Sequence, residues 1–310
     1  MYKAIALALV ASGCTATASV CQRVGVAATK PEGFDLGLLF RLARRPVWLA
    51  GIASMIAGFA FQVSALRFGP LALVQPILAL ELPLVFGYMA LLGSRRVRLR
   101  DWLAACAMSA GLGVFLLAAS PSGGRLHAPA ALWWLAGLAS AGAVLAALAL
   151  SFGLGRRPAA PASRRAAVLG IAAGLAWGFE AAVIKEFSSR LGGGAGAVFG
   201  NWSVYVLITA GAASLLLASH ALAAGPLAAS QPGFTIVDPL AASLLGLFLF
   251  GERMRSGMID LAGEAAGLAL LAVGVSVLSH SQLIHGGDEP PGQAARPSPR
   301  GASPSAAARC

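Results

Sequence analysis

The sequence predicts an all-α polytopic membrane protein with about nine transmembrane helices in two inverted-topology repeats. Three observations predict this fold class. Of the 310 residues, 58% are hydrophobic and only 11% are charged, whereas a soluble globular domain carries about 25% charged residues. Nine apolar stretches are each long enough to cross a bilayer, which takes about 20 helical residues. Finally, the segment at residues 65–76 recurs at residues 221–232.

The nine apolar stretches define the predicted spans. We expect helices, because a backbone in lipid must satisfy its own hydrogen bonds. The first stretch also resembles a signal peptide, since Lys3 is followed by an apolar run and a cysteine at Cys14. We expect it to be retained as a span, because the apolar run continues to Val20 and the repeat requires it. The spans cover residues 2–22, 46–66, 71–93, 102–120, 129–152, 166–187, 197–219, 226–250 and 257–279.

The basic residues predict the orientation in the plasma membrane. Thirteen of them lie in the gaps after the first, third and fifth spans, and six lie on the opposite side. The positive-inside rule then puts the N-terminus outside and the C-terminus in the cytoplasm. This grouping in short gaps also explains the net charge of +11 without nucleic-acid binding. Residues 281–310, rich in Pro, Ala, Ser and Gly, are expected to form a disordered cytoplasmic tail.

The repeat divides the chain. Residues 65–76 read ALRFGPLALVQP and residues 221–232 read ALAAGPLAASQP, at a constant offset of 156. We therefore expect a first repeat over residues 1–128 with spans one to four. Residues 129–165 form a linking span and a basic loop, and residues 166–280 form a second repeat. Because five spans precede the second copy, it starts from the opposite side of the membrane, which is a transporter architecture.

Matched prolines interrupt one span in each repeat. Pro76 and Pro83 in span three correspond to Pro232 and Pro239 in span eight. Proline removes a backbone donor and crowds the preceding turn. We expect these four residues to bend spans three and eight around a shared central cavity, where transporters of this architecture bind substrate.

The same motifs resemble the drug/metabolite transporter superfamily. GPLALVQP and GPLAASQP each enter a proline-interrupted helix, and the second is followed by LGLFLFGERM. The Gly251-Glu252 pair is similar to the end-of-helix signature of EamA-type repeats, although the first copy has Ser94 at the Glu position. Nine spans with an external N-terminus are closer to the NIPA-type magnesium-transporter-like branch. The resemblance covers about residues 1–280 and implies a transporter fold, but it leaves the solute open.

Ionisable residues inside the spans are the main site candidates, because a charge in the bilayer is costly. Glu81 and Asp238 lie two residues and one residue before matched prolines, near the midplane, and we expect them to be the functional pair. They would also be the ligands of any metal ion. The alternative is a structural ion pair with Lys185, which could equally extend to the membrane surface. The complete candidate set is Glu81, Asp238, Gln75, Gln231, Glu180, Lys185, Trp177, Asn201 and Tyr205.

Two further clusters have structural interpretations. Gly170, Gly174 and Gly178 form a ladder of small residues on span six that predicts close helix packing. Asp260 and Glu264 lie one turn apart, and we expect them to form a solvated salt-bridge cluster with Arg253 and Arg255.

The leading functional hypothesis is a secondary carrier. It would move a small solute by alternating access between the inverted halves, with proton coupling through Glu81 or Asp238 as one option. The alternative is a NIPA-type magnesium or divalent-cation pathway, in which Gln75 and Gln231 add oxygen ligands. An enzyme is not expected, because no nucleophile–base pair or metal-ligand set is found, and no cofactor is expected either. The partners are then the bilayer and a small-molecule or cation substrate, with a homodimer left open.

Overall fold

The protein is described from a computed structural model that covers residues 1–27, 44–91, 98–155, 162–225 and 227–280. Within these residues, nine helical segments are long and apolar enough to cross a membrane. They confirm the predicted spans to within a few residues at most ends. The segments are Tyr2–Cys21, Pro46–Phe68, Leu71–Tyr88, Leu99–Ala119, Ala130–Leu154, Ala162–Gly193, Trp202–Leu222, Ala229–Phe250 and Met258–Val277.

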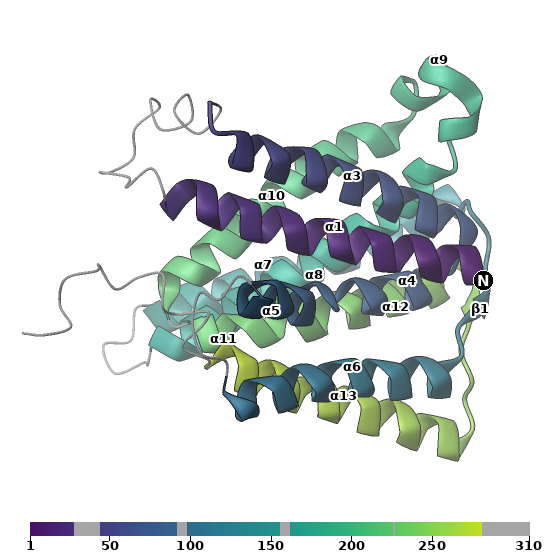
Figure 1. Ribbon diagram of the computed structural model, residues 1–310. Helices are drawn as coiled ribbons and strands as arrows, with labels where there is room; N and C mark the ends of the chain where they lie inside the picture. The colour runs from purple at the N-terminus through teal and green to yellow at the C-terminus, as the bar shows by residue number, and fades with distance from the viewer. Residues whose placement is uncertain (28–43, 92–97, 156–161, 226, 281–310) are drawn as a thin grey trace, which may run out of the picture.

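The described chain is almost entirely α-helical (Figure 1). The helices are α1 (Tyr2–Ala27), α3 (Pro46–Phe68), α4 (Leu71–Leu78), α5 (Glu81–Leu91), α6 (Leu99–Ala119), α7 (Ala130–Gly155), α8 (Ala162–Ser188), α9 (Gly194–Phe199), α10 (Trp202–Ala224), α11 (Leu227–Pro232), α12 (Asp238–Phe250) and α13 (Met258–Ser279). The predicted tail at residues 281–310 lies outside the described residues.

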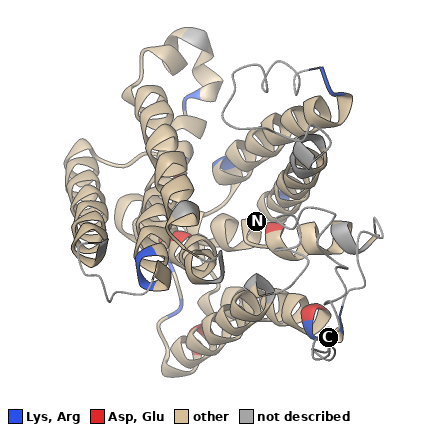
Figure 2. Cartoon of the chain, turned by 90° about the vertical axis from the view of Figure 1, so that its left-hand side faces the viewer, with Lys and Arg blue, Asp and Glu red and all other residues tan. Residues whose placement is uncertain are grey.

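Six of the long helices pack in pairs, and one of these helices, α8, also contacts several others. α1 packs along α3, α6 along α13 and α10 along α8 (Figure 1). α8 also contacts α7, α11 and α12, which makes it the hub of the bundle. Charged residues are sparse along the ribbons (Figure 2), as expected for helices whose outer faces meet lipid.

Glycines on α8 allow the close packing that their spacing predicts. A Cβ atom added at Gly174 would lie 2.3 Å from the carbonyl oxygen of Gly233. One added at Gly170 would lie 2.5 Å from the carbonyl oxygen of Ser230, and one at Gly178 would lie 2.6 Å from the Cβ of Ala241. The backbones of α8 and the eighth span therefore touch, and only a residue without a side chain fits between them.

The third and eighth spans are both interrupted between their matched prolines. In the third span, α4 contains Pro76 and ends at Leu78, and α5 begins at Glu81. In the eighth span, α11 ends at Pro232, a π-helical turn covers Gly233–Val237, and α12 begins at Asp238. Proline lacks the donor that an unbroken helix needs, and single π-helical turns are frequent at functional sites. Both spans therefore depart from a regular α-helix between their matched prolines, and the expected bend around a shared central cavity stays a prediction.

Two short strands join the loops at one end of the bundle. β1 (Ser122–Gly123) and β2 (Glu252–Arg253) form an antiparallel pair in which Gly123 faces Glu252. β1 follows α6, and β2 follows α12. The N-terminus lies at the same end of the bundle (Figure 1). We call this the N-terminal end, and it holds most of the polar contacts described below.

Candidate functional site

Glu81 faces the first helix. It is the first residue of α5, and α5 packs against α1. The hydroxyl of Ser19 on α1 donates a hydrogen bond to Glu81 Oε1 over 2.8 Å. The carboxylate is therefore held between the interrupted third span and α1.

Asp238 faces α8 instead. It is the first residue of α12, and its Oδ1 atom is buried without a hydrogen-bond partner among the described residues. Asp238 interacts electrostatically with Glu180 of α8. The hydroxyl of Ser214 on α10 donates to Glu180 Oε2 over 2.8 Å. We call Asp238, Glu180 and Ser214 the acidic site; it spans α8 and two helices that pack against α8, namely α10 and α12.

The structure thus groups the candidate carboxylates differently from the sequence prediction. Glu81 has its bonded partner in α1, and Asp238 has its electrostatic partner in α8. The two residues keep equivalent places in the chain, since each begins the helix that follows an interruption. Their shared function stays a prediction, whereas the closeness of Asp238 to Glu180 is a new observation.

Lys185 neither extends to the surface nor pairs with the two midplane carboxylates. It forms a buried ion pair with Glu252 of β2, and the two side chains are 3% and 0% exposed. Its amino group also lies 4.7 Å from the centre of the Phe250 ring, which adds a cation–π contact. Lys185 therefore takes neither of the two positions expected from the sequence, at the membrane surface or paired with a midplane carboxylate. No sequence pattern indicates Glu252 as its partner.

Glu252 also caps a helix from the other half of the chain. Its carboxylate accepts hydrogen bonds from the backbone N–H groups of Leu71, over 2.5 Å, and Ala72, over 2.9 Å. These are the first residues of α4 and have no partner within the helix. A carboxylate at this position is also favoured by the helix dipole. One fully buried side chain therefore connects α4, α8 and the loop after α12.

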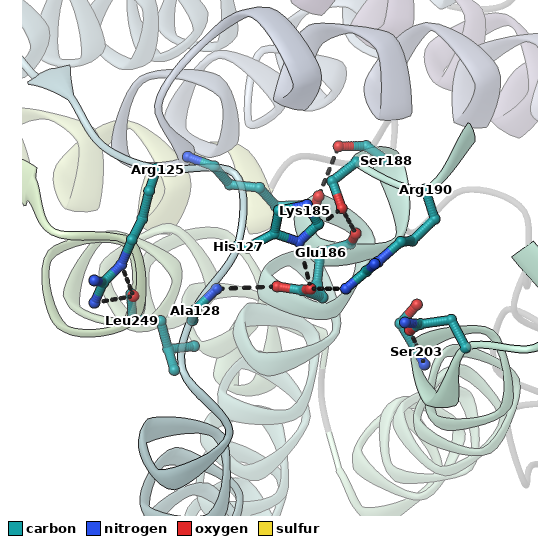
Figure 3. Close-up of polar contacts among 11 residues, drawn as sticks. Arg125, His127, Ala128, Lys185, Glu186, Ser188, Arg190, Ser203 and Leu249 are labelled. Atoms are coloured by element: carbon teal, nitrogen blue, oxygen red, sulfur yellow. Dashed lines mark hydrogen bonds and ion pairs between the residues drawn. The ribbon is translucent and has the colours of Figure 1, made fainter. Parts of the chain in front are cut away.

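Glu186, the neighbour of Lys185, organises a second polar group at the N-terminal end (Figure 3). Its carboxylate lies 2.9 Å from His127 Nδ1 and 3.5 Å from Arg190, and it accepts from the Ala128 N–H over 3.2 Å. Glu186 holds the start of α7 against the end of α8. No motif in the sequence indicates this group, because His127 and Ala128 lie in the loop before α7, far from Glu186 in the chain.

Two arginines nearby donate hydrogen bonds to carbonyl oxygens at the ends of helices. Arg67 donates to the carbonyl oxygen of Ser188 over 3.1 Å, and Arg125 donates twice to that of Leu249, each over 3.2 Å. These carbonyls belong to the last turns of α8 and α12, where a cation is favoured. The hydrogen bonds of Arg125 are visible in Figure 3.

These arginines and Lys185 line a cavity of about 250 Å³ at the N-terminal end. The lining also includes Gly69 and Pro70, from the turn before α4, and Gly124, from the loop after β1. This cavity lies beside the start of the repeated GPLALVQP motif, and its lining includes none of the prolines at the span interruptions. The expected central cavity stays a prediction.

The remaining candidates have mainly local partners. Gln75 is buried in α4, and Gln231 donates to the hydroxyl of Thr235 over 3.4 Å. The Trp177 ring packs against Phe234 of the π-helical turn, with ring centres 5.2 Å apart. This contact places Trp177 beside the interruption of the eighth span.

Asn201 and Tyr205 each have a local hydrogen-bond partner near the start of α10. Asn201 caps α10 by accepting from the Ser203 N–H over 2.9 Å. The Tyr205 hydroxyl donates to the carbonyl oxygen of Phe199 over 2.9 Å, and the side chain is exposed on the outside of the bundle.

The predicted salt-bridge cluster on the ninth span is wrong at Glu264. Its Oε1 atom is buried without a hydrogen-bond partner in the described part of the chain. Its electrostatic neighbour is the acidic Asp260, so the two repel each other. Sequence proximity to Arg253 was misleading, because β2 ties that residue into a ladder with β1. Within the described ranges, no group of three or more His, Cys, Asp or Glu side chains is arranged to hold a metal ion.

Comparison with known proteins adds one relative. The chain is 27% identical over 269 residues to an uncharacterized protein of Corynebacterium glutamicum, an alignment that covers 85% of this chain and 89% of that protein. No known protein family matches the sequence. No solved structure matches it either.

Proposed function

We propose that the protein is a secondary transporter of the drug/metabolite type, which moves a small solute across the plasma membrane by alternating access between two inverted-topology repeats. One observation carries the proposal. The third and eighth spans are each interrupted, and each resumes at a carboxylate, Glu81 or Asp238. Charged groups inside a membrane are retained mainly at substrate and ion pathways, and interrupted helices in corresponding positions mark the binding site of such carriers.

The packing of the interrupted spans supports this function. α4 packs against α12, so segments from both proposed repeats meet inside the bundle. The helices that would be equivalent also pair in the same manner, α1 with α3 and α8 with α10. Two similar units that meet along interrupted helices can rock against each other and expose a central site to either side in turn.

The acidic site is the proposed place of ion coupling. Asp238 and Glu180 interact across α8 and α12, and the buried Lys185 is already paired with Glu252. Two carboxylates that repel each other in a low dielectric are stabilised by a proton or a cation between them. The site can therefore load a proton when it is open to one side and release it on the other.

The Lys185–Glu252 pair is the proposed closure of the N-terminal end. It connects α8 and the loop after α12 to the start of α4, which belongs to the first proposed repeat. Alternating access requires the two repeats to separate at this end, and these contacts would have to open for that.

Flux in proteoliposomes tests the proposal. The purified full-length protein would be screened against classes of labelled solutes, with and without a pH gradient. We expect one solute class to accumulate above protein-free vesicles, and a proton gradient to increase its accumulation. Vesicles with Asp238→Asn should lose the gradient-driven part. Failure of every solute class to exceed protein-free vesicles, with correctly folded protein, would remove the transport proposal.

A divalent-cation pathway is the second candidate, and the acidic site favours it. Magnesium keeps several waters and often takes only one or two carboxylates from the protein. Asp238 and Glu180 supply two carboxylates beside the hydroxyl of Ser214. Magnesium uptake in the same vesicles separates the two functions, because a carrier for another solute leaves internal magnesium unchanged.

A further inference from the structure

We propose that the cavity at the N-terminal end binds a small anion, a carboxylate or phosphate compound, whose negative charge replaces Glu252 at Lys185. This inference deepens the proposed function, because it names the chemical class of the solute that enters from this end. We call the cavity lined by Arg67, Arg125 and Lys185 the cationic cavity.

The charges around the cationic cavity are unbalanced. Its basic groups come from three separate elements, namely the end of α3, the loop after β1 and α8. None of its lining residues is acidic. Glu252 is not a lining residue, and in the described part of the chain its ion-pair partner is Lys185. Two positive charges therefore remain at the cavity wall, and such a concave, basic surface attracts anions.

The two arginines are positioned by bonds that leave donors for a ligand. Arg67 uses Nη1 for the Ser188 carbonyl, and Arg125 uses Nε and Nη2 for the Leu249 carbonyl. A guanidinium carries five N–H donors and binds carboxylates and phosphates in a fork geometry. Each side chain is thus held by a helix end while further N–H groups stay available to a ligand.

The volume sets the size of the ligand. The cavity holds about 250 Å³, whereas pockets for drug-sized ligands begin at about 300 Å³. The close approach of the loop limits the space further, because a Cβ atom at Gly124 would lie 2.8 Å from Glu252 Cγ. A compound with one or two anionic groups fits better than a large amphiphile.

Anion binding would act directly on the closure of this end. Lys185 both lines the cationic cavity and holds Glu252. An anion bound to Lys185 competes with Glu252, and Glu252 is the residue that connects the loop after α12 to α4. A solute that loosens this connection on binding couples its own recognition to the opening of the bundle.

Equilibrium binding tests the site without any need for flux. The full-length protein in detergent would be melted in sodium phosphate and in disodium succinate, each against sodium chloride at equal ionic strength. A ligand that binds the folded state raises the midpoint in a concentration-dependent way. We expect at least one of these anions to do so, and we expect the apparent Kd to rise about tenfold in Arg67→Gln and in Arg125→Gln, since each loses a charge-assisted hydrogen bond.

The matched control removes the same charge at the opposite end. Arg164 and Arg165 are exposed at the start of α8, far from the cationic cavity. R164Q/R165Q should bind the anions as the wild type does. Equal binding by all variants, or no stabilisation of the wild type by either anion, overturns the proposal. If an Arg→Gln variant does not fold, Arg→Lys at the same position replaces it, with a smaller but measurable loss expected.

A second set of melts, in lipid, distinguishes a soluble anion from a lipid headgroup as the source of the anionic group. The same melts would be run in nanodiscs of phosphatidylcholine, with and without phosphatidylglycerol. Stabilisation by phosphatidylglycerol that depends on Arg67 and Arg125, without any effect of the free anions, would overturn a soluble ligand and identify a lipid headgroup. Anion binding without flux would refute only the transport function, whereas flux without arginine-dependent binding would refute only this site.

Tryptophan fluorescence tests the displacement of Glu252. Lys185 lies over the Phe250 ring, and Phe250 makes an edge contact with Trp133, at 6.1 Å between ring centres. Movement of Lys185 toward an anion should change the emission of Trp133. We expect a saturable change on titration with the stabilising anion in the wild type and a loss of that change in Trp133→Phe. An unchanged spectrum at saturating anion would overturn the displacement step.

Discussion

Lys185 of α8 and Glu252 of β2 form an ion pair that is almost completely buried, and the same carboxylate caps the first turn of α4. A buried pair of this kind is costly to assemble, because both charges lose their hydration. It also specifies an arrangement, since removal of either partner leaves the other charged and buried. The pair therefore defines how α4, α8 and the loop after α12 meet.

Removal of one partner should destabilise the protein strongly. We expect Lys185→Met and Glu252→Gln each to lose about 3–5 kcal/mol of stability, because each leaves an unsatisfied buried group. The double variant should recover part of that loss, since no unpaired charge remains. The measurement is the fraction of monodisperse protein after a heat step, for the two single variants and the double variant.

Arg190→Gln provides the control for this cycle. Its contact with Glu186 is a longer ion pair, of 3.5 Å, with a half-exposed guanidinium. Exposed pairs contribute about 0–1 kcal/mol, so this variant should behave almost as the wild type. A Lys185→Met protein as stable as Arg190→Gln would show that the buried pair does not hold the end together.

Loss of a carboxylate in the acidic site should affect transport and not folding. Asp238→Asn and Glu180→Gln keep the shape of each side chain but cannot exchange a proton. We expect proton-driven flux to fall by about tenfold or more, which corresponds to about 1.4 kcal/mol, with normal protein yield. Glu264→Gln is the matched control, because that carboxyl also has a buried oxygen without a partner but lies on α13. Equal flux in the three variants would exclude the acidic site from coupling.

Glu81→Gln tests the second carboxylate of the predicted pair. Glutamine can still accept the hydrogen bond of the Ser19 hydroxyl, so the contact between α5 and α1 should persist. If Glu81 takes part in coupling, flux should drop by about tenfold while expression and melting stay unchanged. A loss of yield together with flux would instead indicate a structural role at this helix contact.

The sequence predicted the large features of this fold, because they depend on composition and on local patterns of residues. Nine apolar runs, matched prolines and a glycine ladder each act through local chemistry, and each appears in the structure. The pairing of charges could not be predicted in this way. Lys185 and Glu252 are 67 residues apart, and only the turn at the end of α12 and the β1–β2 ladder bring them together.

The candidate site likewise has features that the sequence predicts and features that it does not. Each carboxylate begins the helix after an interruption, and this position follows from its spacing to the matched prolines. Both residues can therefore be identified from the sequence. Which neighbour each one faces depends on the rotation of its helix. Asp238 turns toward Glu180 because Gly174 and Gly178 let the π-helical turn and the start of α12 lie against α8. No periodicity within the eighth span encodes that contact.

Filling the glycine contact should therefore disturb both folding and the acidic site. Gly174→Leu places a side chain where a Cβ atom alone would already lie 2.3 Å from a backbone oxygen. Overpacking of this kind costs about 1–3 kcal/mol or more, so we expect a lower melting midpoint. Gly137→Leu on α7 is the matched control, because a Cβ atom there meets nothing within 4 Å. Similar midpoints for the two variants would contradict the close contact between α8 and the eighth span.

The orientation of the bundle is the remaining prediction, and reporter fusions test it directly. The positive-inside rule expects fusions after residues 40, 97 and 160 to report the cytoplasm and fusions after residues 68 and 125 to report the exterior. Arg67 and Arg125 oppose that rule, because they place positive charge on the predicted outer side. Both arginines donate to helix-end carbonyls and line the cationic cavity, so their positions have a structural reason that is independent of topology. The opposite reporter pattern would mean that the cationic cavity faces the cytoplasm, and anions would then reach it from inside the cell.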